Sequence, residues 1–243
     1  MTNKRKFLMI LFFVFMLIGN TMNAQNSINK SLCIQEQSIV TIAALTAIGD
    51  IDNLKIELNK GLDAGLTINE IKEILVQLYA YCGFPRSLNG INALMAVLEE
   101  RKIKGIQDKK GQEASIIDSK LDKYQSGKQN LQQLTGIEEK ELKGANAFTP
   151  IIDTFLKEHL FADIFNRDVL NFEQRELTTI AALASMSGVT PQLQAHIGMG
   201  MNTGITETQI LKAFDLIEKN IGKQQAIIAR EVLAKVIIAR QNK

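Results

Sequence analysis

The five-residue string Thr-Ile-Ala-Ala-Leu occurs twice in this chain, at 41–45 and at 179–183. Around the second copy, apolar residues follow the i, i+3, i+4, i+7 spacing of one helix face: Leu177, Ile180, Ala181 and Ala184. A chain that repeats a helical string at such a distance is constrained to build the same helix twice. The repetition is therefore the first guide to the fold.

A matching pair of helix boundaries lies downstream of the two strings. The segment "LDAGLTINEI" (62–71) parallels "MNTGITETQI" (201–210). In each, a glycine suits the left-handed conformation that ends a helix, and a threonine two residues later can form a capping box. The equivalent positions are Gly65, Thr67 and Glu70 in the first copy, and Gly204, Thr206 and Gln209 in the second. We predict an internal duplication of a helical unit.

The rest of the periodicity is also helical, and no strand-like alternation of useful length appears. Residues 101–146 are rich in Lys, Gln, Glu and Gly, which indicates a charged connector with a helix of its own near 121–134. Thr149 and Pro150 are expected to begin a helix over 149–170 that packs on the second unit. The sequence thus predicts an all-α fold of packed helical hairpins. Its parts are a first repeat at 30–107, a connector at 108–146 and a second repeat at 147–241.

The N-terminus has the order of segments of a secretory signal. Basic residues 4–6 precede an apolar run at 7–18 that is too short to cross a bilayer, and small and polar residues follow at 19–24. We expect cleavage after Ala24 and a periplasmic or secreted protein.

Removal of that segment changes the charge of the chain. The full sequence has 28 basic and 26 acidic residues, but three of the basic ones lie within 1–24, so the mature chain is close to neutral. No basic stripe is interleaved with aromatic residues, so a nucleic-acid partner is not expected. No second apolar span long enough for a membrane remains after cleavage.

Three segments, in order, resemble the carboxymuconolactone decarboxylase family, which is related to the alkylhydroperoxidase D-like proteins. They are "EIKEILVQLYAYCGFPRSLNGINAL" (70–94), "HLFADIFNRDVLNFEQRELTTIAALASM" (159–186) and "PQLQAHIGMGMNTGIT" (191–206). The resemblance implies a duplicated helical bundle of the alkylhydroperoxidase D-like type. It also implies a small-molecule substrate, no cofactor or metal, and a homo-oligomer, either a trimer or a hexamer.

The segment "YCGFP" raises the question of whether Cys82 is a redox residue. The peroxidase branch of the family uses a Cys-x-x-Cys pair ahead of a histidine, and here those positions are Val189 and Gln192. Cys82 is therefore not half of a peroxidatic pair. We rank its roles as a buried small residue, then a disulfide with Cys33. A reactive thiol comes last, since no basic neighbour is visible that would lower its pKa.

His196 and Glu176 are the leading candidates for chemistry. His196 shares a helical stripe with Leu193, Ile197 and Gly200, so we expect it to face the interior, where the residues alone favour a core histidine bonded to a carbonyl. The resemblance instead implies proton transfer, for which an imidazole is suited near neutral pH. It also implies that Glu176 orients His196, whereas the residues alone would allow a solvated carboxylate in the first turn of a helix.

The remaining candidates are a second histidine, two arginines and a tyrosine. His159 shares a face with Ile152 and Phe155, and the resemblance implies a second role in the pocket. Two roles are equally open for Arg167. It could form a structural ion pair with Asp163 or Glu173, or it could bind a substrate carboxylate through two parallel hydrogen bonds. Arg86 is another candidate carboxylate binder. Tyr81 and Cys82 lie in the first half and His196 in the second, so one complete pocket is expected where the halves meet, either within one chain or across subunits.

The family's named reaction is a cofactor-free decarboxylation of a carboxylated muconolactone. It requires a cation near a carboxylate, a donor to the lactone and a proton for carbon, which the resemblance assigns to Arg167 or Arg86, Tyr81 and His196. Because that pathway is cytoplasmic and this chain is expected to be exported, we predict a lyase for a small carboxylated or lactone-like compound. The alternatives are a peroxiredoxin-like antioxidant that uses Cys82 alone, and a non-catalytic oligomeric binding protein.

Overall fold

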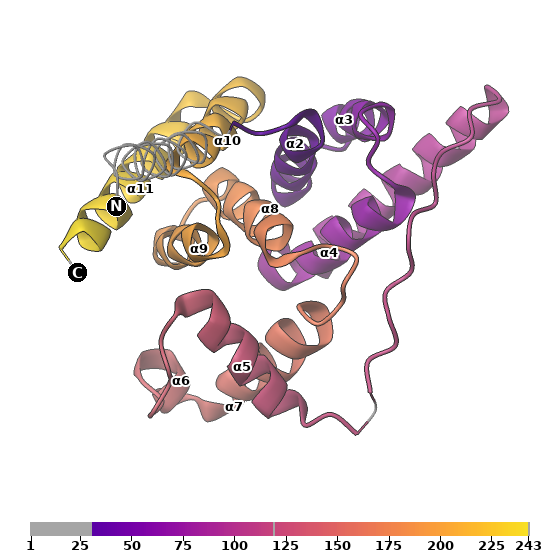
Figure 1. Ribbon diagram of the computed structural model, residues 1–243. Helices are drawn as coiled ribbons and strands as arrows, with labels where there is room; N and C mark the ends of the chain where they lie inside the picture. The colour runs from indigo at the N-terminus through magenta and orange to yellow at the C-terminus, as the bar shows by residue number, and fades with distance from the viewer. Residues whose placement is uncertain (1–30, 119, 243) are drawn as a thin grey trace, which may run out of the picture.

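The computed structural model describes residues 31–118 and 120–242, and the regular elements in this part of the chain are all helices (Figure 1). In chain order these are α2 (Ile34–Ile48), α3 (Ile51–Asp63), α4 (Ile68–Ile103), α5 (Lys123–Thr135), α6 (Gly144–Phe148), α7 (Pro150–Thr154), the π-helix η1 (Phe155–Ile164), α8 (Phe172–Ser185), α9 (Thr190–Thr203), α10 (Glu207–Asn220) and α11 (Lys223–Gln241). The predicted all-α class is confirmed. The predicted signal segment at 1–24 lies outside the described residues. Within the described ones, no helix is both long and apolar enough to span a membrane.

Two helices that pack on each other form the centre of the main body, α2 and α8 (Figure 1). They carry the two copies of the repeated string. Residues 38–47 of α2 and residues 175–185 of α8 are buried on every side. A helix that is buried all round must be covered by others, and α3, α4, α9 and α10 do this here.

The predicted helix boundaries are confirmed. Gly65 and Gly204 have φ of +97° and +112°, the left-handed conformation expected after a helix. Thr67 caps α4 and Thr206 caps α10, each in a reciprocal capping box with the residue three positions on. The internal duplication itself stays a prediction.

Helix α4 bends sharply at the "YCGFP" segment. Gly83 has φ +82° and ψ +157°, a conformation that is open essentially to glycine alone, and Pro85 follows at the start of the second arm. The Ser87 hydroxyl donates to the Leu75 carbonyl at 2.8 Å and so ties the two arms together. α4 packs on α8, and Tyr81 at the end of the first arm reaches His196 of α9.

A smaller group of helices, α5, α6, α7 and η1, lies below the main body (Figure 1). It has its own apolar cluster, formed by Leu134, Leu160, Phe161, Ile164 and Phe165. The helix expected over 149–170 does begin at Pro150, but Thr149 makes no side-chain cap and the helix ends at Ile164. It also packs mainly against the connector helix α5 rather than on the second unit, which corrects our expectation.

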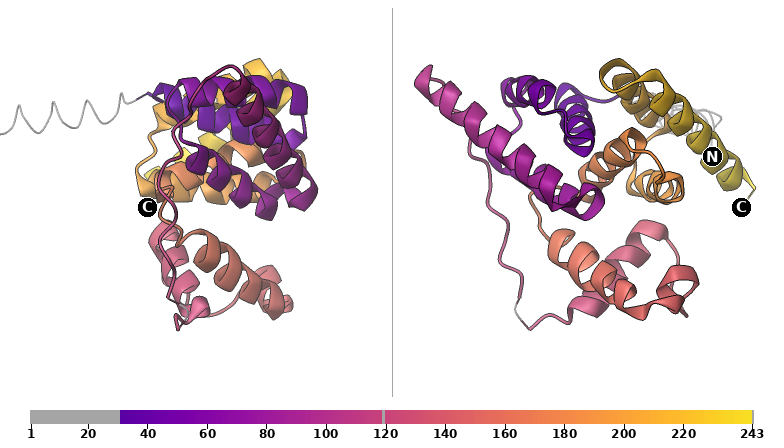
Figure 2. Two further views of the ribbon diagram at one scale, coloured as in Figure 1. Left: turned by 90° about the vertical axis from the view of Figure 1, so that its right-hand side faces the viewer. Right: turned by 180° about the vertical axis from the view of Figure 1, so that it is seen from behind.

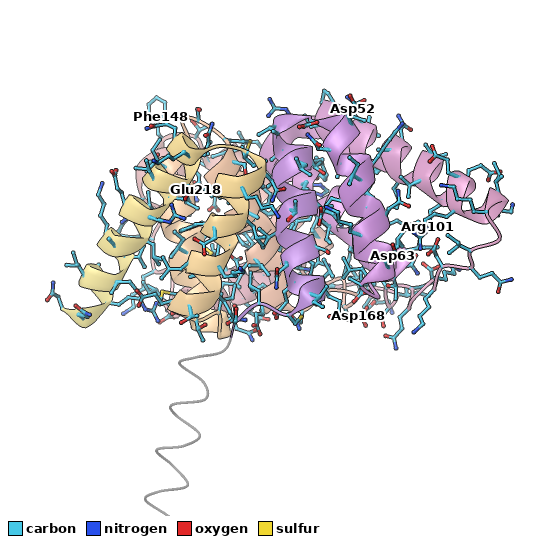
Figure 3. The ribbon with its side chains drawn as sticks, turned by 90° about the horizontal axis from the view of Figure 1, so that it is seen from above. Asp52, Asp63, Arg101, Phe148, Asp168 and Glu218 are labelled. Atoms are coloured by element: carbon cyan, nitrogen blue, oxygen red, sulfur yellow. The ribbon has the colours of Figure 1, made fainter. Side chains whose placement is uncertain are left out.

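The connector between the main body and the smaller group of helices runs along the outside of the molecule (Figure 2). It is held at its start by Arg101, which lies 2.8 Å from Asp63 and 2.9 Å from Asp108 (Figure 3). Further on, the backbone amides of Ile68 and Asn69 donate to the carbonyls of residues 109 and 110. These bonds fix the path of the connector against the first turn of α4.

Candidate functional site

His196 lies in the middle of α9 and faces the interior. Its stripe-mates Leu193, Ile197 and Gly200 are buried, and the histidine itself is 7% exposed. Gly200 permits the close approach of α9 to α8, because a Cβ there would lie 2.9 Å from Ile180 Cδ1 and 3.5 Å from Glu176 Cβ. The expectation of an inward-facing histidine is confirmed.

Glu176 meets this histidine from α8. Its Oε2 lies 2.8 Å from His196 Nδ1, and its side chain is fully buried, so it is not a solvated first-turn carboxylate. An ionised carboxylate only accepts hydrogen bonds, so in this contact Nδ1–H of His196 is the donor to Glu176. Nε2 is then the ring nitrogen left to exchange a proton with a ligand.

Tyr81 reaches the same pair from the first arm of α4. Its ring meets the His196 ring edge-on, with centroids 5.4 Å apart and an interplanar angle of 80°. The Tyr81 hydroxyl and Oε1 of Glu176 are both buried and have no hydrogen-bond partner. Two unpartnered buried groups beside a histidine are unusual in a protein interior and mark a place where a ligand atom could bind.

Burial, and then the nearby Glu176 carboxylate, raise the pKa of Tyr81 far above its usual range. The Thr179 hydroxyl lies nearby and tempers this rise, but it is engaged with Gln77 and with the Arg175 carbonyl. Tyr81 is therefore a phenol at physiological pH, with an O–H that can donate.

A buried ionic network joins the two halves next to this site. Glu73, in α4, accepts from Nε of Arg167 at 3.0 Å and from Nη2 of Arg175 at 3.2 Å. Arg175 also donates to Gln77 at 2.9 Å. The partner of Arg167 is thus Glu73, not Asp163, and its guanidinium is engaged in an internal clamp rather than offered to a substrate.

The sequence reasoning missed Glu73, Gln77 and Arg175. A signal existed for two of them, since the motif that supplied Glu176 begins with Arg175, and Gln77 interrupts the apolar run 74–81 in α4.

His159 is not brought to the Glu176–His196 pair. Its side chain is 51% exposed on η1, with Nδ1 3.1 Å from Asp163 Oδ2. Its ring lies 5.6 Å from that of Tyr79, which stacks on Phe84. The second pocket role that the resemblance implied for His159 is therefore not supported at this pair, because the outer face of η1 is left uncovered.

Cys82 and Cys33 are both free thiols, so the structure does not contain the disulfide that was the second reading of Cys82. Cys82 is half-buried and its Sγ donates to the Leu78 carbonyl at 3.2 Å. Burial raises the pKa of the Cys82 thiol, and Arg86, one turn further on, opposes the rise. The sequence showed no basic neighbour of Cys82, and the structure corrects this by placing Arg86 near it. Burial is still the larger effect on the pKa of the Cys82 thiol.

Arg86 is exposed, and its Nη1 lies 3.8 Å from Met186 Sδ. Within the described part of the chain, no carboxylate forms an ion pair with Arg86. Arg86, unlike Arg167, is therefore not held by a carboxylate, and its contact lies at the C-terminal end of α8.

Comparison with known proteins bears on the first half of this site. Residues 19–96 match the carboxymuconolactone decarboxylase family. The carboxymuconolactone decarboxylase segment contains Tyr81, Cys82 and Arg86, while Glu176 and His196 lie beyond it.

A stretch of 64 residues is 39% identical to a protein of Acinetobacter baylyi named 4-carboxymuconolactone decarboxylase. The match covers 26% of this chain and 45% of that relative. The chain therefore spans about half the length of the curated relative that it matches.

No group of three or more His, Cys, Asp or Glu side chains in the described residues is arranged to hold a metal ion. The arrangement offers a buried acid–base pair, a phenol donor and an exposed guanidinium instead. These are groups that can bind an anion and move a proton.

Proposed function

We propose that this protein is a cofactor-free lyase of the carboxymuconolactone decarboxylase type that acts on a small carboxylated or lactone-like compound. The observation that carries the proposal is the buried Glu176–His196 pair with the unpartnered Tyr81 hydroxyl beside it. The match of residues 19–96 to the family supports the same reaction class.

The proposed reaction breaks the bond between a carboxylate carbon and a lactone-ring carbon from which the electron pair can delocalise onto the lactone carbonyl. The electron pair of that bond passes to the carbonyl oxygen, and carbon dioxide leaves. Tyr81 donates a hydrogen bond to the oxygen on which negative charge develops. His196 takes up a proton from solvent at Nε2 and then delivers it to the ring carbon, while Glu176 holds the ring and stabilises its charged form. Arg86 binds a carboxylate of the substrate.

We also infer that the site is a product of the duplication, with Tyr81 supplied by the first unit and the Glu176–His196 pair by the second. A homo-oligomer is supported by an apolar stripe on the second arm of α4, where Phe84, Leu88 and Met95 are 62%, 53% and 63% exposed. Export by the segment at 1–24 stays part of this proposal.

Turnover of 4-carboxymuconolactone and related lactone carboxylates by the mature protein tests the proposal. His196→Gln should lower kcat by at least about a hundredfold, which is the typical contribution of a general acid–base. His159→Gln, on the outer face of η1, should change kcat less than about threefold on the same scale. Equal activity of wild type and His196→Gln on a turned-over substrate would contradict the assignment.

A further inference from the structure

A second candidate site lies apart from the Glu176–His196 pair, between the end of α5, one face of α9 and the last turns of α11. The cavity there has a volume of about 470 Å³, which is within the usual range for small-molecule sites. Pro191, Met199 and Val236 give it apolar walls, and Gln194, Asn202 and Arg240 are polar groups on its lining. Neither His196, Glu176 nor Tyr81 lines it.

Arg240 is turned onto this cavity by specific bonds. Its Nη1 donates to Asn202 Oδ1 at 2.9 Å and, at 3.4 Å, to the Gly198 carbonyl. Asn202 in turn donates to the Leu134 carbonyl at 2.9 Å, so it holds the guanidinium while it joins α9 to α5. A cation in the last turn of a helix is favoured by the helix dipole. The helix dipole alone does not explain why the Arg240 side chain lies against α9, where it contacts Gly198 and Asn202.

The charge of Arg240 is uncompensated within the described part of the chain. Four other arginines there each pair with at least one carboxylate: Arg101, Arg167, Arg175 and Arg230. Among the described residues, Arg240 donates only to two neutral oxygens, those of Gly198 and Asn202. The remaining donors of its planar fork match the two oxygens of a carboxylate.

We propose that this cavity binds a small organic carboxylate with an apolar body, whose carboxylate meets Arg240 and whose body lies against Met199 and Val236. The site goes beyond the proposed lyase activity, because it shares no lining residue with the Glu176–His196 pair. It adjoins that pair along α9, where Ala195 lines the cavity and His196 follows it. Binding there is measurable whether or not the protein turns over a substrate.

Benzoate is a suitable probe, titrated into the mature full-length protein and followed by two-dimensional NMR. We expect saturable shifts of amides in α9 and α11, and no saturable binding of benzamide, which has the same shape without the charge. Arg240→Gln should weaken benzoate binding at least about tenfold, as expected for loss of a charge-assisted bidentate contact. Arg230→Gln is the matched control on the same helix, since Arg230 pairs with Asp215 and Glu218 outside the cavity.

A second variant separates the cavity from a general charge effect. Ala239→Phe fills the cavity from an exposed helical position and keeps Arg240, so it should also abolish the benzoate shifts. The proposal is overturned if benzoate does not saturate, or if Arg240→Gln or Ala239→Phe binds it as wild type does. Because the readout is binding, a negative result here leaves the lyase proposal to its own turnover assay.

Discussion

A buried imidazole has two nitrogens to satisfy, and in this protein Glu176 supplies the partner for only one of them. The contact at 2.8 Å fixes the ring of His196 and directs its second nitrogen away from α8. Beside it, the Tyr81 hydroxyl is buried without a partner. Such unmet groups destabilise a fold, so their presence together favours a role in binding a ligand atom.

The alternative function, an antioxidant that uses Cys82 alone, also depends on the properties of a single residue. Burial raises the pKa of Cys82, and each unit of pKa removes a factor of ten in thiolate at neutral pH. We expect iodoacetamide to modify the exposed Cys33 at least about tenfold faster than Cys82, as followed by mass spectrometry. Arg86→Gln should slow Cys82 further, because it removes the charge that opposes the rise. A Cys82 that reacts as fast as Cys33 would revive the antioxidant reading.

Individual site residues were predictable where the signal was local. The inward face of His196 came from one helix stripe, whereas its pairing with Glu176 was implied only by the family resemblance, and the structure brings the two into contact. The partner of Arg167 was not predictable, because Glu73 lies 94 residues away in the sequence. His159 was misplaced because the apolar pattern of its helix does not reveal which face the fold leaves uncovered.

At the scale of elements, the α5–η1 pair is held by a point of very close contact. A Cβ at Gly127 of α5 would overlap the backbone carbonyl of Lys157 in η1. Alanine is a better helix former than glycine by about 1 kcal/mol, but here the overlap must dominate. Gly198 of α9 is the matched control, because a Cβ there would meet nothing within 4 Å.

We therefore expect opposite signs from two identical substitutions. Gly127→Ala should lower the free energy of unfolding by about 1–3 kcal/mol, the usual cost of overpacking. Gly198→Ala should raise it by up to about 1 kcal/mol. Urea denaturation followed by circular dichroism measures both, and a stabilising Gly127→Ala would show that α5 does not pack on η1 in this way.

Lys157 is the second feature that holds this pair together. Its side chain is fully buried and its ammonium bonds to Asp153, Glu139 and the Tyr124 hydroxyl. Burial alone would lower the pKa of Lys157, but these partners outweigh it and raise the pKa. The lysine is therefore charged at neutral pH and is occupied as a structural cation.

Removal of that cation should be costly. Lys157→Met leaves the buried Asp153 carboxylate without its cation, and we expect a loss of about 3–5 kcal/mol in the free energy of unfolding. Lys123→Met, which removes a half-exposed partner of Asp163, should cost far less, because solvent screens an exposed ion pair. Equal losses for the two variants in urea denaturation would contradict the structural role of Lys157.

The helix boundaries were more predictable than the packing of the helices. Gly65 with Thr67, and Gly204 with Thr206, are local stop and start signals, and both were confirmed. The choice of α5 as the partner of η1 depends on a glycine whose meaning appears only when the two helices meet. The π-helical course of η1 carries no sequence signal that we could identify.

At the scale of the whole molecule, the two halves meet along α2 and α8 and are tied by the Glu73 network. The candidate site lies at this junction, with Tyr81 supplied by the first half and the Glu176–His196 pair by the second. A site of this kind exists only when both halves are folded and docked. The central claim is therefore that His196 is held by Glu176 and touched by Tyr81.

The most direct test is NMR of the mature protein labelled at histidine and tyrosine, since the chain has two histidines and three tyrosines. We predict that His196 is locked in the Nδ1–H tautomer and gives cross-peaks to the Tyr81 ring, 5.4 Å away between centroids. His196→Gln and His159→Gln assign the two rings, which is needed because His159 lies near Tyr79. A His196 that exchanges freely between tautomers and shows no contact with Tyr81 would contradict the account.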